Sequence, residues 1–222
     1  MVTTGNEFMD PYDDLPVHAR ISLAWQPAAR RLALQCVYAL DARMGGVVAN
    51  AREPMLAQIR LAWWRDRLNE PADRRPAGEP LLTMIGEGWV GREPALVPLV
   101  DAWEALLCDT DPQDGTIAAF ADGRGHALAA FAQGCGDTGI GAALAGRRWA
   151  LADLASRMGE TPARDAARKL ARTMPDTRRF SRSLRGLAVL DALAARALSR
   201  GQQMTVDRSA ALLAWRVGMT GR

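Results

Sequence analysis

The sequence of 222 residues is poor in the residue types that favour β-strands. It contains only 2 Tyr and 4 Phe, and its β-branched residues are thinly spread. The apolar residues, 49% of the chain, are mostly Ala and Leu, which lose little conformational entropy in a helix. No segment alternates between apolar and polar residues as a half-buried strand does. The composition therefore predicts an all-α protein.

Long apolar runs, a basic leader and paired cysteines are also missing. The hydrophobic stretches are interrupted every few residues by Arg, Asp or Gly, and fall short of the roughly 20 residues that span a bilayer. The first 14 residues contain acidic but no basic side chains, the reverse of a signal peptide. The three cysteines, Cys36, Cys108 and Cys135, have no short paired spacing, so no disulfide framework or zinc site is indicated. We expect a cytoplasmic protein, soluble or peripheral to a membrane.

Flexible linkers and internal repeats are absent as well. We therefore expect residues 1–222 to form a single domain, with residues 1–15 as a flexible N-terminal segment. Proline and glycine divide the chain into about eight or nine predicted helices. These cover residues 27–46, 53–68, 81–89, 94–108, 115–134, 141–158, 162–173, 184–200 and 207–217.

Positive charge comes almost entirely from arginine, since Lys169 is the single lysine. Residues 1–110 carry 11 basic and 15 acidic side chains, whereas residues 111–222 carry 17 basic and 10 acidic ones. The densest basic segment contains Arg164, Arg168, Lys169, Arg172, Arg178, Arg179, Arg182 and Arg185. Such a segment suits the phosphates of lipid, nucleotide or nucleic acid, although most charge runs are simply solvated helix faces.

Two features that could carry chemistry have simpler interpretations. Residues 134–141 satisfy the G-x-G-x-x-G pattern of dinucleotide-binding loops, but that motif must follow a strand and the preceding residues look helical. A glycine-rich turn between helices is the better interpretation. His18 and His126 have no Ser, Cys or carboxylate neighbour arranged for proton relay, so we expect structural roles for both.

Several short motifs between residues 30 and 68 are arranged as in the squalene/phytoene synthase family. They are Arg30-Arg31, Tyr38-Ala39-Leu40, Glu53-Pro54-Met55-Leu56, Ile59-Arg60-Leu61 and Trp63-Trp64-Arg65. Two later segments, residues 145–152 and 185–190, resemble the short divergent branch of that family, which includes a mitochondrial respiratory complex I assembly factor. The resemblance covers the chain from about residue 15 to residue 200.

This resemblance implies a single helical bundle of the isoprenoid synthase type around a central cavity. In active members two aspartate-rich motifs hold magnesium, which binds the diphosphates of two prenyl substrates. By the same resemblance, Tyr38, Trp63 and Leu151 are candidates for lining the cavity. Trp63 and Trp64 also fit ordinary core packing, which large rings at helical spacing usually serve.

The chain departs from the family at both aspartate-rich motifs. Aligning Tyr38 with the family places Gly45 and Ala49 where the first pair of metal ligands belongs. The second motif falls at residues 151–160, where only Asp153 and Glu160 are acidic. Asp41 and Glu53 lie near the first motif but lack its spacing. We therefore predict no catalytic, metal-binding or cofactor-binding residues.

Three functional hypotheses follow. The first is a non-catalytic synthase-like protein that acts in prenyl-lipid binding or membrane-complex assembly, with Arg178, Arg179, Arg182 and Arg185 contacting an anionic membrane surface and with a possible protein partner. The second is an active prenyl-diphosphate transferase with displaced metal ligands. Of the three hypotheses, only this one requires Mg²⁺ as a cofactor. The third is a basic helical protein that binds nucleic acid, which is the least favoured because no docking element such as a helix-turn-helix is visible.

Overall fold

The computed structural model describes residues 15–159, 161–176, 179–204 and 207–221. Within these residues the chain forms ten α-helices, three short 3₁₀ helices and no strand, which confirms the all-α prediction. The α-helices are α1 (Val17–Trp25), α2 (Ala28–Ala49), α3 (Pro54–Asn69), α4 (Pro80–Gly88), α5 (Val97–Cys108), α6 (Asp114–Gly134), α7 (Ile140–Arg157), α8 (Pro162–Arg172), α9 (Arg185–Arg200) and α10 (Arg208–Thr220). The 3₁₀ helices are η1 (Ala72–Arg74), η2 (Glu93–Leu96) and η3 (Arg182–Leu184).

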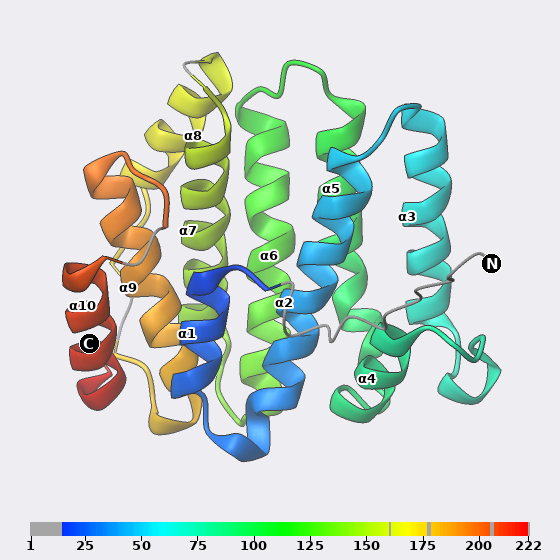
Figure 1. Ribbon diagram of the computed structural model, residues 1–222, viewed down its shortest axis with the longest axis horizontal. Coiled ribbons are helices and arrows are strands. Elements are labelled where there is room, and N and C mark those ends of the chain that lie inside the picture. Colours follow the sequence, from blue (N-terminus) through cyan, green and yellow to red (C-terminus); the bar gives the residue numbers. More distant parts are fainter. Residues whose placement is uncertain (1–14, 160, 177–178, 205–206, 222) are drawn as a thin grey trace, which may run out of the picture.

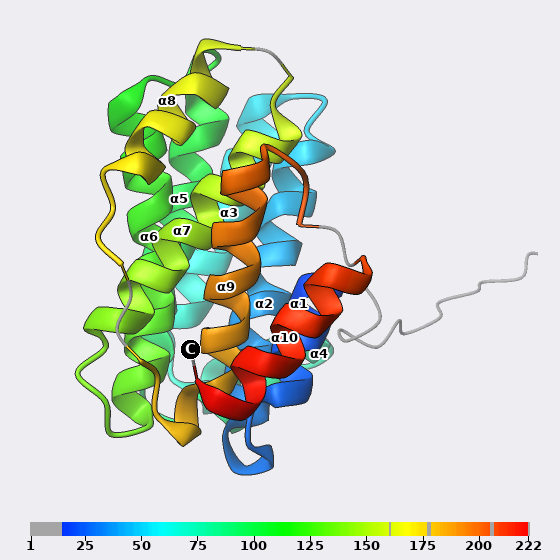
Figure 2. The same ribbon diagram turned by 90° about the vertical axis from the view of Figure 1, so that its left-hand side faces the viewer.

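The long helices stand side by side, with α6 in the middle of the molecule (Figure 1). α6 packs between α5 and α7, and α9 packs on the other side of α7. α2 contacts α4, α5 and α6, while α8 covers α6 and α7 (Figure 2). The bundle ends with α3 against α5 on one side and α10 against α9 on the other. α3 and α10 therefore lie at opposite ends of the longest axis.

The helix boundaries agree closely with the sequence pattern, with two differences. α1 (Val17–Trp25) was not expected, because its buried face includes the polar residues His18 and Ser22 and its apolar periodicity is weak. α2 also continues through the Gly45-Gly46 pair to Ala49, although two glycines in a helix interior cost about 1 kcal/mol each. Packing of α2 within the bundle offsets that cost.

Glycine allows three helices to approach closely at the centre of the bundle. A Cβ atom at Gly123 of α6 would lie 2.3 Å from the Cβ of Ala102 in α5. A Cβ atom at Gly146 of α7 would lie 2.5 Å from the carbonyl oxygen of Arg124 in α6. Any larger side chain at either position would push the backbones apart. The glycines thus bring α5 and α7 against α6 at the level of Arg124.

The turn between α6 and α7 contains the glycine-rich sequence that matched the dinucleotide-binding pattern. Gly136 and Gly139 there have φ of +81° and +82°, a left-handed conformation that favours glycine. The segment before them is helix α6 and not a strand, so the interpretation as a turn between helices is confirmed.

Candidate functional site

A buried network of charged residues occupies the centre of the bundle and was not anticipated from the sequence. Arg124 of α6 is 1% exposed, and its guanidinium group contacts one carboxylate from α2 and one from α7. Its Nε and Nη2 atoms donate to the two oxygens of Asp41 at 2.7 and 2.8 Å. Nη2 also donates to Asp153 at 2.9 Å. Arg124 therefore links the consecutive helices α6 and α7 to α2, which is distant in sequence.

The two carboxylates are satisfied by further donors. The indole N–H of Trp103 donates to Asp41 at 3.0 Å, and Nε of Arg157 donates to Asp153 at 2.7 Å. Two guanidinium groups thus face two carboxylates, and the network carries no net charge. This balance matters because an unpaired charge in a protein interior is costly.

Aromatic rings enclose the Arg124 guanidinium on its remaining sides. Its central carbon lies 4.1 Å from the ring centre of Trp149, 4.7 Å from that of Phe120 and 5.4 Å from that of Trp103. The π faces of these rings attract a cation, and the attraction is stronger where water is excluded. The rings and the carboxylates thus lie around a buried guanidinium group whose Nη1 atom has no hydrogen-bond partner among the described residues.

The environment shifts the pKa values of the ionisable groups in the network. Burial raises the pKa of Asp41 above its usual value despite the opposing effect of Arg124. Burial acts in the same direction on Asp153, but Arg124 and Arg157 together outweigh it and hold the pKa of Asp153 below its usual value. Burial also lowers the pKa of His18 to about 4. His18 is therefore neutral at physiological pH, and its Nε2 atom accepts a hydrogen bond from Trp149 at 3.2 Å.

A surface hollow of about 430 Å³ reaches the edge of this network. It lies beside α1 and the end of α7, and its lining includes His18, Asp153 and Arg157. The side-chain carboxylate of Asp153 is only 7% exposed and already has two arginine partners. The hollow therefore presents a neutralised carboxylate and a neutral imidazole.

Neither Gly45 nor Ala49, the residues that the resemblance equates with the first aspartate-rich motif, has a side-chain oxygen, and position 45 has little space for one. A Cβ atom at Gly45 would lie 3.1 Å from two ring carbons of Trp103, which is a tight contact. Ala49 is exposed at the end of α2. At the second position, Asp153 belongs to the Arg124 network and Glu160 lies outside the described residues. Nowhere in the described part of the chain do three or more His, Cys, Asp or Glu side chains form a group that could hold a metal ion.

The three candidate cavity residues occupy different environments. Tyr38 is fully buried on α2, where its hydroxyl group lies 2.7 Å from that of Ser22 and its ring packs edge-on against Trp149. Leu151 is fully buried on α7. Trp63 lies on the outer face of α3 with 37% of its surface exposed, so its assignment to the core is wrong, whereas Trp64 is buried as expected.

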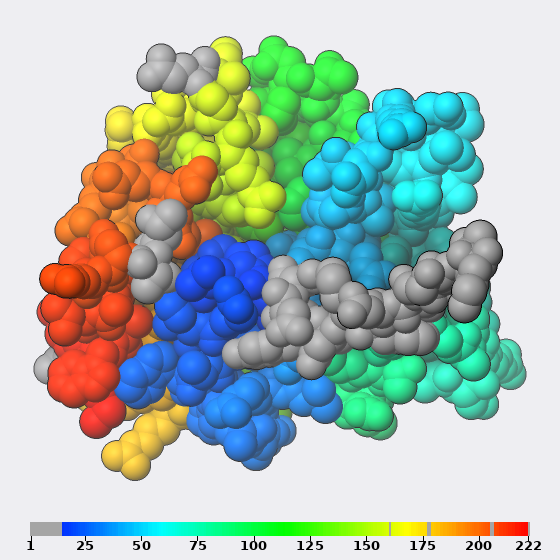
Figure 3. Space-filling view, in the orientation of Figure 1, coloured from blue at the N-terminus to red at the C-terminus, as the bar shows by residue number. Residues whose placement is uncertain are grey.

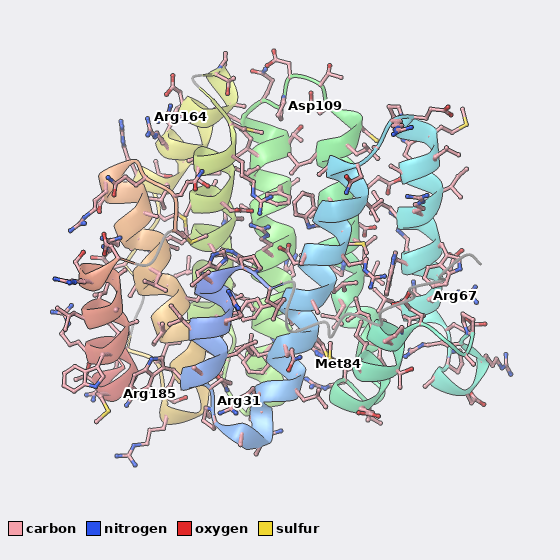
Figure 4. All side chains as sticks on the ribbon, viewed as in Figure 1. Arg31, Arg67, Met84, Asp109, Arg164 and Arg185 are labelled. Atoms are coloured by element: carbon pink, nitrogen blue, oxygen red, sulfur yellow. The ribbon has the colours of Figure 1, made fainter. Side chains whose placement is uncertain are left out.

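The basic segment from Arg164 to Arg185 divides into two groups. Arg164 lies at the upper end of α8 and Arg185 at the lower end of the molecule (Figure 4). Arg168, Lys169 and Arg172 belong to α8 with Arg164, whereas Arg179 and Arg182 precede α9. Arg178 lies outside the described residues. The seven described cations of this segment therefore do not share one face.

One helix among the described residues, α2, is long and apolar enough to cross a membrane by length and composition alone. The sequence pattern had indicated none. In the bundle 56% of the apolar window of α2 is buried against other helices, as in the core helix of a globular domain. Its apolar surface therefore already has protein partners.

Comparison of the chain with protein-family models, with curated proteins and with solved structures found no match.

One local signal could have revealed Arg124 before the structure was known. Residues 117–132 are rich in Ala and apolar residues, and Arg124 stands among them with a glycine on either side. A lone arginine flanked by glycines in an apolar helix indicates close helix packing around a buried charge. Its partners could not be deduced in this way, because Asp41 and Asp153 are 83 and 29 residues distant.

Proposed function

We propose that this chain is a non-catalytic protein of the squalene/phytoene synthase type, with an isoprenoid synthase-like helical bundle, that acts in binding or assembly at a membrane. The observation that carries the proposal is the position of Arg124, whose guanidinium group bridges Asp41 and Asp153. Asp41 lies near the first position, and Asp153 within the second, at which active members of the family that the chain resembles bind magnesium.

The chemistry of prenyl transfer supports this interpretation. Magnesium requires oxygen ligands, and it offsets the charge that develops on the departing diphosphate. Here the carboxylates of Asp41 and Asp153 are already neutralised by arginine, and Gly45 and Ala49 supply no oxygen. A transferase with displaced ligands would have to move Arg124, which is 1% exposed, out of its ion pairs.

The packed interior favours a role at the surface over enclosure of a prenyl chain. Tyr38 on α2 and Leu151 on α7 are both fully buried, and Arg124 with its three rings lies in the same interior. A prenyl lipid between α2 and α7 would have to displace these side chains. We therefore favour membrane-complex assembly, with a membrane surface or a protein as partner, and a peripheral location on the cytoplasmic side.

An assay for condensation tests the non-catalytic assignment. The full chain is incubated with farnesyl or geranylgeranyl diphosphate and Mg²⁺, and head-to-head products are measured against a control without protein. We expect no product. Gly45→Asp with Ala49→Asp should not create activity, because the carboxylate introduced at position 45 would meet the Trp103 ring and the second motif would still be lacking. Product above the control that disappears with a chelator would establish the displaced-ligand transferase instead.

A further inference from the structure

The last helix, α10, has its large apolar side chains on the outside and its small ones on the inside. The residues that pack inward against the bundle are Ala210, Ala214, Val217 and Gly218. Leu212, Trp215 and Met219 point outward and are 67%, 61% and 61% exposed. Their spacing of three and four residues aligns them in one stripe along the helix. A helix that only completed a core would have the opposite distribution.

The inner face of α10 is closely fitted to the bundle, so the outward stripe does not result from loose packing. A Cβ atom at Gly218 would lie 2.2 Å from the ring of Trp25. The side chain of Asp207 caps the first turn by accepting from the backbone N–H of Ala210 at 2.7 Å. α10 is thus held in one orientation against α9 (Figure 2), with its apolar stripe left exposed.

Arginine side chains gather at the C-terminal end of α10. Nη2 of Arg179 donates to the carbonyl oxygen of Thr220 at 3.0 Å, and Arg185 lies against Gly221. Partial burial, together with the nearby charges of Arg179 and Arg182, lowers the pKa of Arg185. Arg216 lies beside the stripe on α10 itself, about 40° around the helix from Leu212. Within the described residues none of these four arginines forms an ion pair.

We infer that the outer face of α10, with Arg179, Arg182, Arg185 and Arg216, is a docking surface for an anionic lipid bilayer. This inference rests on the proposed role at a membrane and names the surface that performs it. Leu212, Trp215 and Met219 would enter the boundary between headgroups and acyl chains, where tryptophan is favoured. The arginines would remain at the level of the lipid phosphates. In the space-filling view α10 forms the edge of the molecule, with the segment before α9 directly below it (Figure 3).

The other exposed apolar helix lacks this charge arrangement. α3 at the opposite end exposes Met55, Leu56, Ile59 and Trp63. Two of its three arginines are paired with carboxylates, Arg65 with Asp101 and Glu104, and Arg67 with Glu70. An anionic surface would gain little from cations that are already neutralised. α3 therefore provides a matched control with similar apolar exposure.

Flotation of the full chain with lipid vesicles tests the inference. We expect binding to vesicles of phosphatidylcholine with about one third phosphatidylglycerol, little binding to pure phosphatidylcholine, and weaker binding as salt screens the charges. Replacing Arg179, Arg182 and Arg185 with Gln should weaken binding by roughly five-fold for each arginine. Replacing Leu212, Trp215 and Met219 with Ser should reduce it by about ten-fold or more. The same change at Met55, Ile59 and Trp63 should leave binding within about two-fold of the parent.

A fluorescence measurement covers the case in which the serine variant does not fold. Trp215→Phe preserves an aromatic ring, and the blue shift of tryptophan emission on vesicle binding should be largely lost in this variant and kept in Trp63→Phe. An undiminished blue shift in Trp215→Phe would overturn the inference. So would full binding by a folded α10 serine variant, or a loss of binding in the α3 variant alone.

Two other results would identify a different occupant of this face. Tighter binding to duplex DNA than to anionic vesicles at equal salt would assign the arginines to nucleic acid. A dimer of the parent that the α10 variant dissociates, without any change in vesicle binding, would assign the stripe to a second copy of the chain. If the folded parent binds no vesicles, the docking surface is rejected, while the condensation assay still decides separately whether the protein is an enzyme.

Discussion

At Arg124 a single guanidinium group faces two buried carboxylates, and substitution can measure what this contributes to folding. Arg124→Met should lower the free energy of unfolding by about 3–5 kcal/mol, because it leaves the buried carboxylates of Asp41 and Asp153 without the positive charge of Arg124. Urea denaturation measures the loss. Arg147→Met is the matched control on the surface, where the pair with Asp122 is 34% and 43% exposed and should contribute about 0–1 kcal/mol.

A further substitution separates the charge from the packing of Arg124. Adding Asp41→Asn and Asp153→Asn to Arg124→Met removes the uncompensated charges, and we expect part of the lost stability to return. If Arg124→Met cost no more than Arg147→Met, the network would not contribute to stability. If the two Asn substitutions lowered stability further, the loss would come from the shape of the arginine and not from its charge.

His18 gives the protein a pH dependence whose sign follows from its burial. Its pKa falls from an ordinary value of 6.5 to about 4 in the folded protein. Between these values the unfolded chain binds a proton that the folded chain does not, so stability is lost as the pH falls from 6.5 towards 4. The contribution present above the ordinary pKa of histidine is about 3 kcal/mol.

The contribution of His18 is measured by comparing urea midpoints across this pH range. His18→Gln can still accept the hydrogen bond from Trp149 but does not titrate, so the variant should lose less stability in acid than the parent. His126→Gln serves as the control because His126 is exposed on α6. Equal acid sensitivity of His18→Gln and the parent would contradict the assignment of the pH effect to His18.

At the level of the helix, α3 distinguishes two adjacent tryptophans. Neighbouring residues on a helix point about 100° apart, so Trp64 faces the core at 4% exposure while Trp63 remains 37% exposed. Trp64→Ala should cost about 3–5 kcal/mol, as truncation of a buried aromatic usually does. Trp63→Ala should lower the free energy of unfolding by no more than about 1.5 kcal/mol. The loss comes chiefly from its edge-on contact with Trp64, whose ring centre lies 5.3 Å from that of Trp63.

Thermal or urea unfolding of the two variants tests this difference, and Arg60→Ala on the exposed face of the same helix controls for general effects on α3. Equal losses at Trp63 and Trp64 would mean that the outer face of α3 is covered in solution. A loss of partner binding by Trp63→Ala without loss of stability would assign that face to an interaction surface.

Across the whole molecule, the helices could be predicted better than their contacts. The boundaries of α8 and α9 follow from Pro162 and Gly201, which act locally through backbone conformation. α1 escaped prediction because its buried face carries polar groups that are satisfied only by distant partners. The hydroxyl of Ser22 donates to the carbonyl oxygen of Gly186, 164 residues away in the chain.

The sequence by itself determined the helical class, most helix boundaries and the lack of side-chain oxygens at Gly45 and Ala49, because these depend on residue type and local spacing. Only the tertiary structure decided that Arg124 joins Asp41 and Asp153, that the basic segment divides between two ends of the molecule, and that Trp215 faces outward. Hydrophobic periodicity shows that a helix has an apolar stripe, but not which part of a broad stripe is covered. Burial and ion pairing are set by which helices meet, and that depends on contacts between residues far apart in the chain.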